Sequence, residues 1–136
     1  MREILFRGKR SYNGEWVYGN LVVDAHDNLH IIPNEFFVED GHHLRYEDDT
    51  DKPVFFDPTT LGQFVGFCDK NGVKVFEGDI VKLPSSKSNC KVVFKNGCFV
   101  AEYDLHELTV NNSIYDGNFE VIGNIYDNPE KYKTGV

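Results

Sequence analysis

Cysteine is the residue of this chain that could most readily act as a nucleophile. A nucleophilic cysteine needs a base, usually histidine, within hydrogen-bond reach and a donor that stabilises an oxyanion. Cys68 and Cys98 each stand inside an apolar run beside a predicted hairpin turn, where a free thiol behaves as a small hydrophobic side chain. We therefore expect both to pack in the interior, and we expect Cys90, which follows the polar run 85–89, to be exposed.

Histidines and acidic residues lack the spacings of metal sites. Neither the His-x₃-His nor the Cys-x₂-Cys spacing of zinc sites occurs. His42 and His43 are adjacent, so on an extended chain they point to opposite sides, and the acidic run 47–51 lacks the order of a calcium loop. A phosphate-binding glycine loop and a Gly-x-Ser-x-Gly elbow are also missing. The histidines are His26, His30, His42, His43 and His106. The sequence predicts no catalytic residue, no metal ligand and no cofactor.

The first ten residues are basic and could contact nucleic acid. Phe6 and Tyr12 could stack on bases while the cations bind phosphates. Against this, 14 basic and 22 acidic residues give a net charge of -8, which opposes attraction to a phosphate backbone. We favour the alternative that these charges mark an edge strand and discourage β pairing between molecules. The basic residues are Arg2, Arg7, Lys9 and Arg10.

Turn signals between short apolar runs indicate an all-β fold. Asn-Gly and Asp-Gly pairs tolerate the positive φ angles of type I′ hairpin turns, and the 14% aromatic content favours strands. These pairs are Asn13-Gly14, Asn71-Gly72, Asn96-Gly97 and Asp116-Gly117. Strands are expected at 4–7, 16–23, 29–32, 64–68, 73–76, 80–83, 91–94, 98–103 and 119–126. Helical periodicity is nearly absent.

Glu77-Gly78-Asp79 predicts a tight turn in the second half of the chain. Gly78 would adopt the unusual backbone angle, and Asp79 would accept a hydrogen bond from a nearby amide, which fixes the register of the next strand. Five short strands within residues 60–126 suit a small barrel.

A chain of 136 residues is the size of one domain or of one domain with an appendage. We expect an N-terminal β subdomain with an acidic connector at 1–58, a barrel at 59–128 and a frayed tail at 129–136. Residues 34–57 contain eight acidic and two basic residues, a composition that indicates a solvated loop. Residues 35–38 are also compatible with a short strand or turn.

Three segments resemble one known family. Residues 69–81 read DKNGVKVFEGDIV, residues 119–130 read FEVIGNIYDNPE, and residues 2–9 read REILFRGK, followed by WVYG at 16–19. Together they are similar to the YopX family of phage and prophage proteins. The resemblance implies a β-rich protein with an SH3-like barrel, encoded by phages or integrated prophages, and it carries over no catalytic or ligand residue.

Three features of the sequence indicate the compartment in which the protein acts. It has no run of 18 apolar residues, its N-terminus is charged too early for a signal peptide, and its three cysteines include no Cys-x-x-Cys pair. We expect a cytoplasmic protein of the bacterial host with no membrane association.

The leading hypothesis is a non-catalytic module that binds a protein partner or itself through strand edges and loops. The alternative is a nucleic-acid-associated protein of phage replication or regulation, and a variant has the acidic connector mimic DNA. An enzyme is not expected; it would require His106 or His43 beside Cys68 or a carboxylate in a deep pocket.

Overall fold

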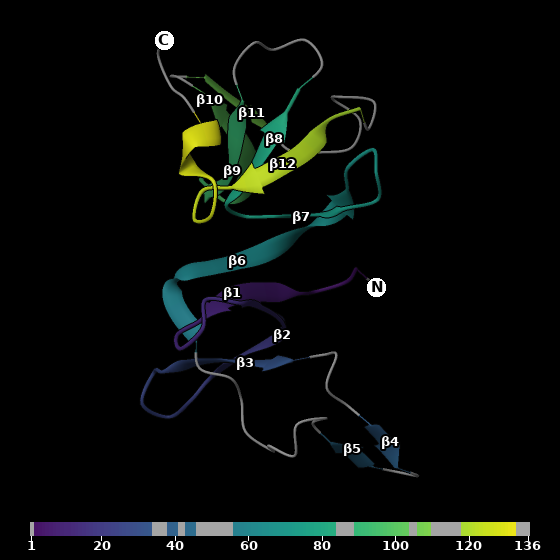
Figure 1. Cartoon of the computed structure of the whole chain (residues 1–136), viewed down its shortest axis with the longest axis vertical. Coiled ribbons are helices and arrows are strands. Elements are labelled where there is room, and N and C mark those ends of the chain that lie inside the picture. The colour runs from purple at the N-terminus through teal and green to yellow at the C-terminus, as the bar shows by residue number, and fades with distance from the viewer. Residues whose placement is uncertain are drawn as a thin grey trace. The chain divides into compact units, whose positions relative to one another are not determined.

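The computed structural model describes residues 2–33, 38–40, 43–45, 56–83, 89–103, 106–109 and 118–132, and these residues form an all-β protein (Figure 1). Its helical element is one 3₁₀ turn, η1 (Pro129–Lys131). The strands are β1 (Phe6–Arg10), β2 (Trp16–Val23), β3 (Leu29–Pro33), β4 (Val38–Asp40), β5 (His43–Arg45), β6 (Phe56–Cys68), β7 (Lys74–Phe76), β8 (Asp79–Lys82), β9 (Cys90–Lys95), β10 (Cys98–Tyr103), β11 (His106–Thr109) and β12 (Glu120–Asn124). The prediction of an all-β fold is confirmed.

The chain divides into two compact units, and the division falls within β6. One unit is Glu3–Gln63, and the other comprises Met1–Arg2 and Phe64–Val136. The boundary expected between residues 58 and 59 lies in the same strand.

In the unit Glu3–Gln63 the strands pair antiparallel in the order β3-β2-β1-β6. Val17 and Ile31 are fully buried, and Phe56 packs with them. Gly8 lies against the Phe56 ring, so a side chain at residue 8 would collide with it. Because β1 pairs with a strand on each side, the expectation that the N-terminal segment is an edge strand is wrong.

β6 begins at Phe56, earlier than the expected strand 64–68. Proline lacks the amide donor that a paired strand needs, so a sequence containing Pro58 does not predict a strand there. The first half of β6 was therefore not predicted. The register between β1 and β6 shifts between Arg7 and Lys9, and the Lys9 amide donates to Thr60 Oγ1 at 2.9 Å. This bulge places Pro58 where the ladder is interrupted and no amide is required.

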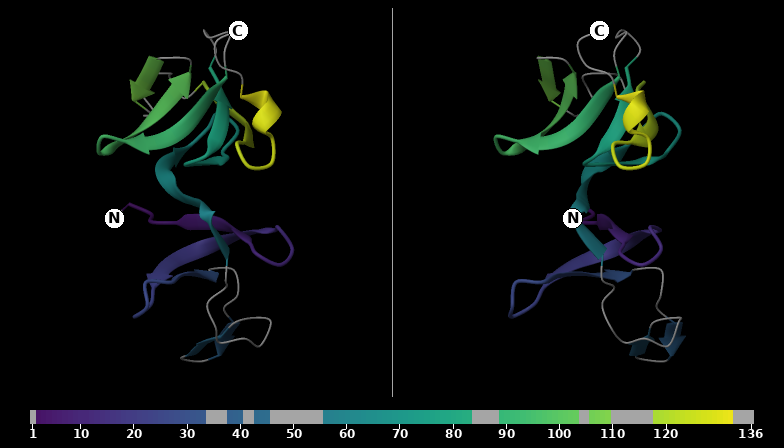
Figure 2. Two further views of the ribbon diagram at one scale, coloured as in Figure 1. Left: turned by 90° about the vertical axis from the view of Figure 1, so that its left-hand side faces the viewer. Right: turned by 60° about the vertical axis from the view of Figure 1, so that its left-hand side comes forward.

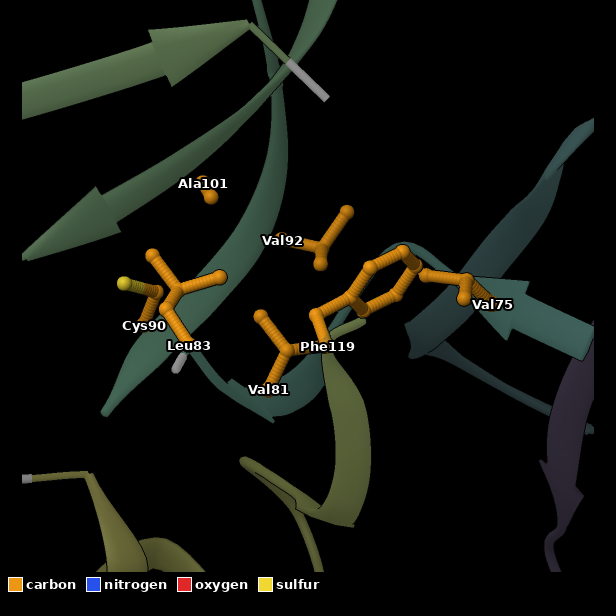
Figure 3. Close-up of a cluster of buried hydrophobic side chains, with 7 residues drawn as sticks. All are labelled: Val75, Val81, Leu83, Cys90, Val92, Ala101 and Phe119. Carbon is orange, nitrogen blue, oxygen red and sulfur yellow. The ribbon is translucent and has the colours of Figure 1, made fainter. Parts of the chain in front are cut away.

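In the second unit one sheet has the order β11-β10-β9-β8-β12, and β7 pairs with the last part of β6. Buried side chains from several of these strands form one core, which Figure 3 shows: Val75, Val81, Leu83, Cys90, Val92, Ala101 and Phe119. Val65 and Phe67 of β6 pack against this core, and the Phe67 and Phe119 rings meet edge to face with centroids 5.8 Å apart.

The predicted SH3-like barrel is not seen as a closed structure. Within the described residues β11 and β12 stand at opposite ends of their sheet and do not pair with each other. What the pairings define is two antiparallel sheets and the small hairpin β4-β5.

Most predicted strands and turns are found. The expected strands 16–23 and 98–103 coincide with β2 and β10, whereas β1 begins two residues later than expected, at Phe6. Asn96 and Gly97 have φ of 53° and 82°, the left-handed geometry that the β9-β10 turn requires. The predicted turn at Asp116-Gly117 lies outside the described residues.

Candidate functional site

The turn Glu77-Gly78-Asp79 has the predicted geometry and a structural role. Gly78 has φ of 89°, and Asp79 is 2% exposed with its Oδ2 accepting the Phe76 amide at 2.8 Å. The Gly78 amide donates to the Val92 carbonyl at 2.8 Å, and its carbonyl accepts the Ile125 amide at 2.9 Å. The turn therefore joins β9 and the segment after β12.

Asp69 is a second buried carboxylate that binds backbone amides. Its Oδ1 accepts the amides of Asn71 and Val73, and its Oδ2 accepts the amide of Val121, each at 2.9 Å. Burial acts to raise the pKa of Asp69, but the hydrogen bonds from Val121, Val73 and Asn71 outweigh it and hold the pKa below its usual value. A carboxylate committed in this way connects the turn 69–73 to β12.

The two C-terminal segments that carry the family resemblance are therefore bound to each other. Lys70 donates its amide to the Phe119 carbonyl at 3.2 Å, beside the bond from Val121 to Asp69. β12 pairs with β8, where Asn124 lies opposite Asp79. Each of these contacts is structural, which agrees with the prediction that the motif sets strand register.

The segment after β12 is packed as far as Tyr132, unlike the frayed tail expected from residue 129. Asn124 Oδ1 accepts two amides of the turn 125–127, and η1 follows. Asn89 Nδ2 donates to the Lys131 carbonyl at 2.8 Å, and Lys91 Nζ lies 5.1 Å from the centroid of the Tyr132 ring. Residues 133–136 lie outside the described part of the chain.

The predicted basic N-terminal face is split between the two sides of its sheet. Arg7 lies opposite Tyr18 and Lys9 opposite Trp16, so these four residues share one side, whereas Phe6 belongs to the other. The Arg7 guanidinium is buried at 6% exposure, 4.6 Å from the Trp16 ring centroid. The aromatic residues on the side of Arg7 and Lys9 are therefore Trp16 and Tyr18, and not Phe6. Which residues of two paired strands share a face depends on the register between the strands, and the sequence alone does not show it.

The remaining members of the predicted basic cluster are placed differently. Arg2 is exposed and precedes β1, and Arg10 lies opposite Phe56 at the end of β1. Tyr12 is 79% exposed in the β1-β2 turn.

The expectations for Cys90 and Cys98 are wrong. Cys90 is fully buried in the core, and burial raises the pKa of its thiol to about 11. It is the first residue of β9 and shares its face with Val92, which the polar run before it concealed. Cys98 is exposed, because it lies beside the Asn96-Gly97 turn, at the exposed end of the β9-β10 hairpin. Cys68 is half-buried.

The histidines do not assemble a site within the described residues. His30 Nε2 lies 2.9 Å from Asp24 Oδ2, and Asp24 Oδ1 accepts the amides of His26 and Asn28 in the β2-β3 turn. The hydrogen bond to His30, with those amide bonds, lowers the pKa of Asp24 to about 2. In the described part of the chain, no three metal-ligating side chains come together. The side chains of His42, His43 and His106 and the run 47–51 lie outside it.

The described structure is that of a protein of two antiparallel sheets in which the buried carboxylates hold the backbone together. A family model described as YopX protein matches residues 5–133, so the chain belongs to the YopX family. The family resemblance inferred from the three segments is confirmed.

One solved structure is similar over nearly the whole chain. It is the crystal structure of protein EF1440 from Enterococcus faecalis, which is 25% identical in sequence and superposes with a TM-score of 0.62. The match covers 98% of this chain and 100% of EF1440. Among curated proteins no match was found. In the described residues no helix has the length and apolar character needed to span a membrane.

Proposed function

We propose that the chain is a non-catalytic protein-binding module that acts in the cytoplasm of a phage-infected or lysogenic bacterium. The observation that carries this proposal is an aromatic pair on the β9-β10 hairpin, formed by the exposed Phe94 and the half-buried Phe99. Phe94 is 55% exposed, and the two ring centroids are 5.1 Å apart at an interplanar angle of 64°.

The aromatic pair continues the buried stripe of the hairpin. Phe94 lies opposite Phe99, and two residues nearer the core Val92 lies opposite Ala101 on the same face. Val92 and Ala101 are buried, so the stripe passes from the core to the surface along one hairpin. Figure 2 shows this hairpin extending away from the rest of its sheet.

A pair of packed phenylalanine rings, one of them exposed at the surface, favours a protein partner. Aromatic side chains supply a large contact area at low entropic cost and are enriched at the centres of protein interfaces. Phenylalanine has no group that binds a phosphate, and the net charge of -8 further disfavours an anionic ligand. The non-catalytic part of the proposal is supported by Asp69, Asp79 and Cys90, whose reactive groups are buried and serve the fold.

Site-specific photo-crosslinking tests this surface. A benzophenone amino acid placed at Phe94 should give discrete protein adducts in host cells, and the same group at Val23, which is 56% exposed, should give none. Light scattering of the purified chain then distinguishes a foreign partner from a second copy. Equal adduct patterns at both positions, or no adduct at Phe94, would contradict the proposal.

A second candidate, nucleic acid association, is supported by the side of the β1-β2 hairpin that carries Lys9, Trp16 and Tyr18. Lys9 Nζ lies 5.8 Å from the Trp16 ring centroid, and such cation and aromatic surfaces stack bases and bind phosphates. Trp16 is the single tryptophan, so its fluorescence reports this face directly. Salt-sensitive quenching by oligonucleotides is expected if the candidate holds, and none at about 50 micromolar protein would exclude it.

The small barrel is retained as a proposal about the second unit. Its support is that β6, β7, β8, β9 and β10 and Phe119 all contribute to one core. Nuclear Overhauser contacts between backbone protons of β11 and β12 would establish closure, and their absence would leave an open sheet.

A further inference from the structure

β12 is an edge strand whose outward backbone groups are occupied by other parts of the chain. It pairs with β8 on one side and stands last in its sheet. An edge strand normally presents unpaired amides and carbonyls that can bind a strand of another molecule. Here the Lys70 amide binds the Phe119 carbonyl, and Asp69 Oδ2 accepts the Val121 amide. This first half of the edge is covered by the turn 69–73, in which Asp69 is buried.

The second half of the edge is covered by the C-terminal segment 128–132, which we name the C-terminal latch. Lys131 Nζ donates to the Ile122 carbonyl at 2.7 Å, and Asn128 Oδ1 accepts the Asn124 amide at 3.3 Å. The Asn128 side chain also lies against Gly123, where an added Cβ would stand 2.5 Å from Asn128 Oδ1. The latch therefore occupies the place that a neighbouring strand would take.

The two covers differ in how firmly they are held. Asp69 is 7% exposed and is fixed by hydrogen bonds within its own turn. Lys131 is exposed in a single 3₁₀ turn that contains no buried residue, so its local opening costs little. The latch can therefore open while the turn 69–73 stays in place.

The groups under the latch match a second copy of the same strand. In an antiparallel pair centred on Gly123, the Ile122 carbonyl of each copy meets the Asn124 amide of the other, which gives two reciprocal hydrogen bonds. Gly123 would face Gly123, and the missing side chain allows close approach. The pair is short and includes residues 122–124 only, because the turn 69–73 stays on residues 119–121 and residues 125–127 form a turn.

We infer that the C-terminal latch is a releasable cover, and that its opening lets β12 pair antiparallel with β12 of a second copy about Gly123. This inference deepens the proposed protein-binding function by naming one partner and the strand that receives it. It uses a different surface from Phe94 and Phe99.

The test uses the full chain without the two side-chain contacts that join the latch to the outer edge of β12. The double variant N128A/K131M should shift the chain from monomer toward dimer, with at least about a tenfold lower dissociation constant in sedimentation equilibrium. Glu130→Gln, an exposed change within the same segment, is the matched control and should leave the constant unchanged. In a mixture of carbon-13-labelled and unlabelled N128A/K131M chains, an intermolecular contact between the Gly123 α protons is expected.

A folded N128A/K131M variant that stays monomeric overturns the inference, and so does a dimer without the Gly123 contact. If the double variant does not fold, K131M alone is measured by the same two criteria. The Phe94 crosslinking experiment tests the proposed protein-binding surface independently. A monomeric N128A/K131M chain does not contradict that surface, and a failed Phe94 crosslink does not contradict pairing through β12.

Discussion

At the scale of single residues, the buried acids of this protein act as anchors for backbone amides. Asp69 accepts hydrogen bonds from two amides of its own turn and from one amide of β12. Asp79 accepts a hydrogen bond from the amide of Phe76, three residues earlier in the chain. A carboxylate can bind several N–H donors at once, so one acid replaces ladder hydrogen bonds where the chain turns.

We predict that Asp69→Ala lowers the free energy of unfolding by about 3 kcal/mol, because it leaves three part-buried amide hydrogen bonds without their shared acceptor. Asp69→Asn retains one accepting oxygen and should cost less. Urea unfolding measures both. Glu130→Gln removes an exposed charge and should change the free energy by less than about 0.5 kcal/mol; a similar loss in this control would contradict a specific role for Asp69.

Gly78 and Gly72 form a matched pair for separating backbone strain from side-chain collision. Their φ angles are 89° and 82°, so alanine is strained at both, but a Cβ on Gly78 would stand 2.9 Å from Tyr126 Cε2 while Gly72 has open space. We predict that Gly78→Ala destabilises by about 1 to 2 kcal/mol more than Gly72→Ala in urea unfolding. Equal losses would show that the Tyr126 ring moves aside freely.

At the scale of elements, the β2-β3 turn is organised by Asp24 and should respond to acid. Its folded pKa of about 2 lies below the ordinary 3.8, so its stabilisation is complete above about pH 5 and is lost as the pH falls from 3.8 through 2. We predict that the amide resonances of His26 and Asn28 titrate together with a midpoint near 2. In Asp24→Asn this transition should be absent; a midpoint near 4 in the unaltered chain would contradict the bonded carboxylate.

Local signals in the sequence were sufficient for turns and for strands with uninterrupted apolar character. Asn96-Gly97 specifies a left-handed turn by itself, and residues 16–23 specify β2 by alternation and aromatic content. The start of β6 was not predictable, because Pro58 is compatible with a strand only beside a bulge that Thr60 creates in contact with β1. That information is tertiary.

The roles of side chains were less predictable than the strands. Whether Cys90 or Cys98 is buried depends on which residue of each strand faces the core, and a shift of one residue reverses the outcome. The pairing of Arg7 with Trp16 likewise depends on register across the hairpin. The edge cover on β12 joins residues 69 and 121, which no local pattern connects.

At the scale of the whole molecule, the two units have separate hydrophobic cores and share the continuous strand β6. Val17 and Val92 are each fully buried, one in each core. Trp16 belongs to the unit Glu3–Gln63, and its fluorescence therefore follows the unfolding of that unit alone. Hydrogen exchange of the β9 amides follows the other unit. The two probes can therefore distinguish one cooperative structure from two.

We predict that the units unfold separately, since regions with their own buried clusters form distinct cooperative units. Val92→Ala should destabilise the second unit by about 2 kcal/mol in exchange of the β9 amides and leave the urea midpoint of Trp16 fluorescence unchanged. Val17→Ala should do the reverse, which makes each variant the control for the other. If Val92→Ala moves the Trp16 midpoint as much as Val17→Ala does, β6 transmits unfolding from one core to the other and the chain behaves as a single cooperative domain.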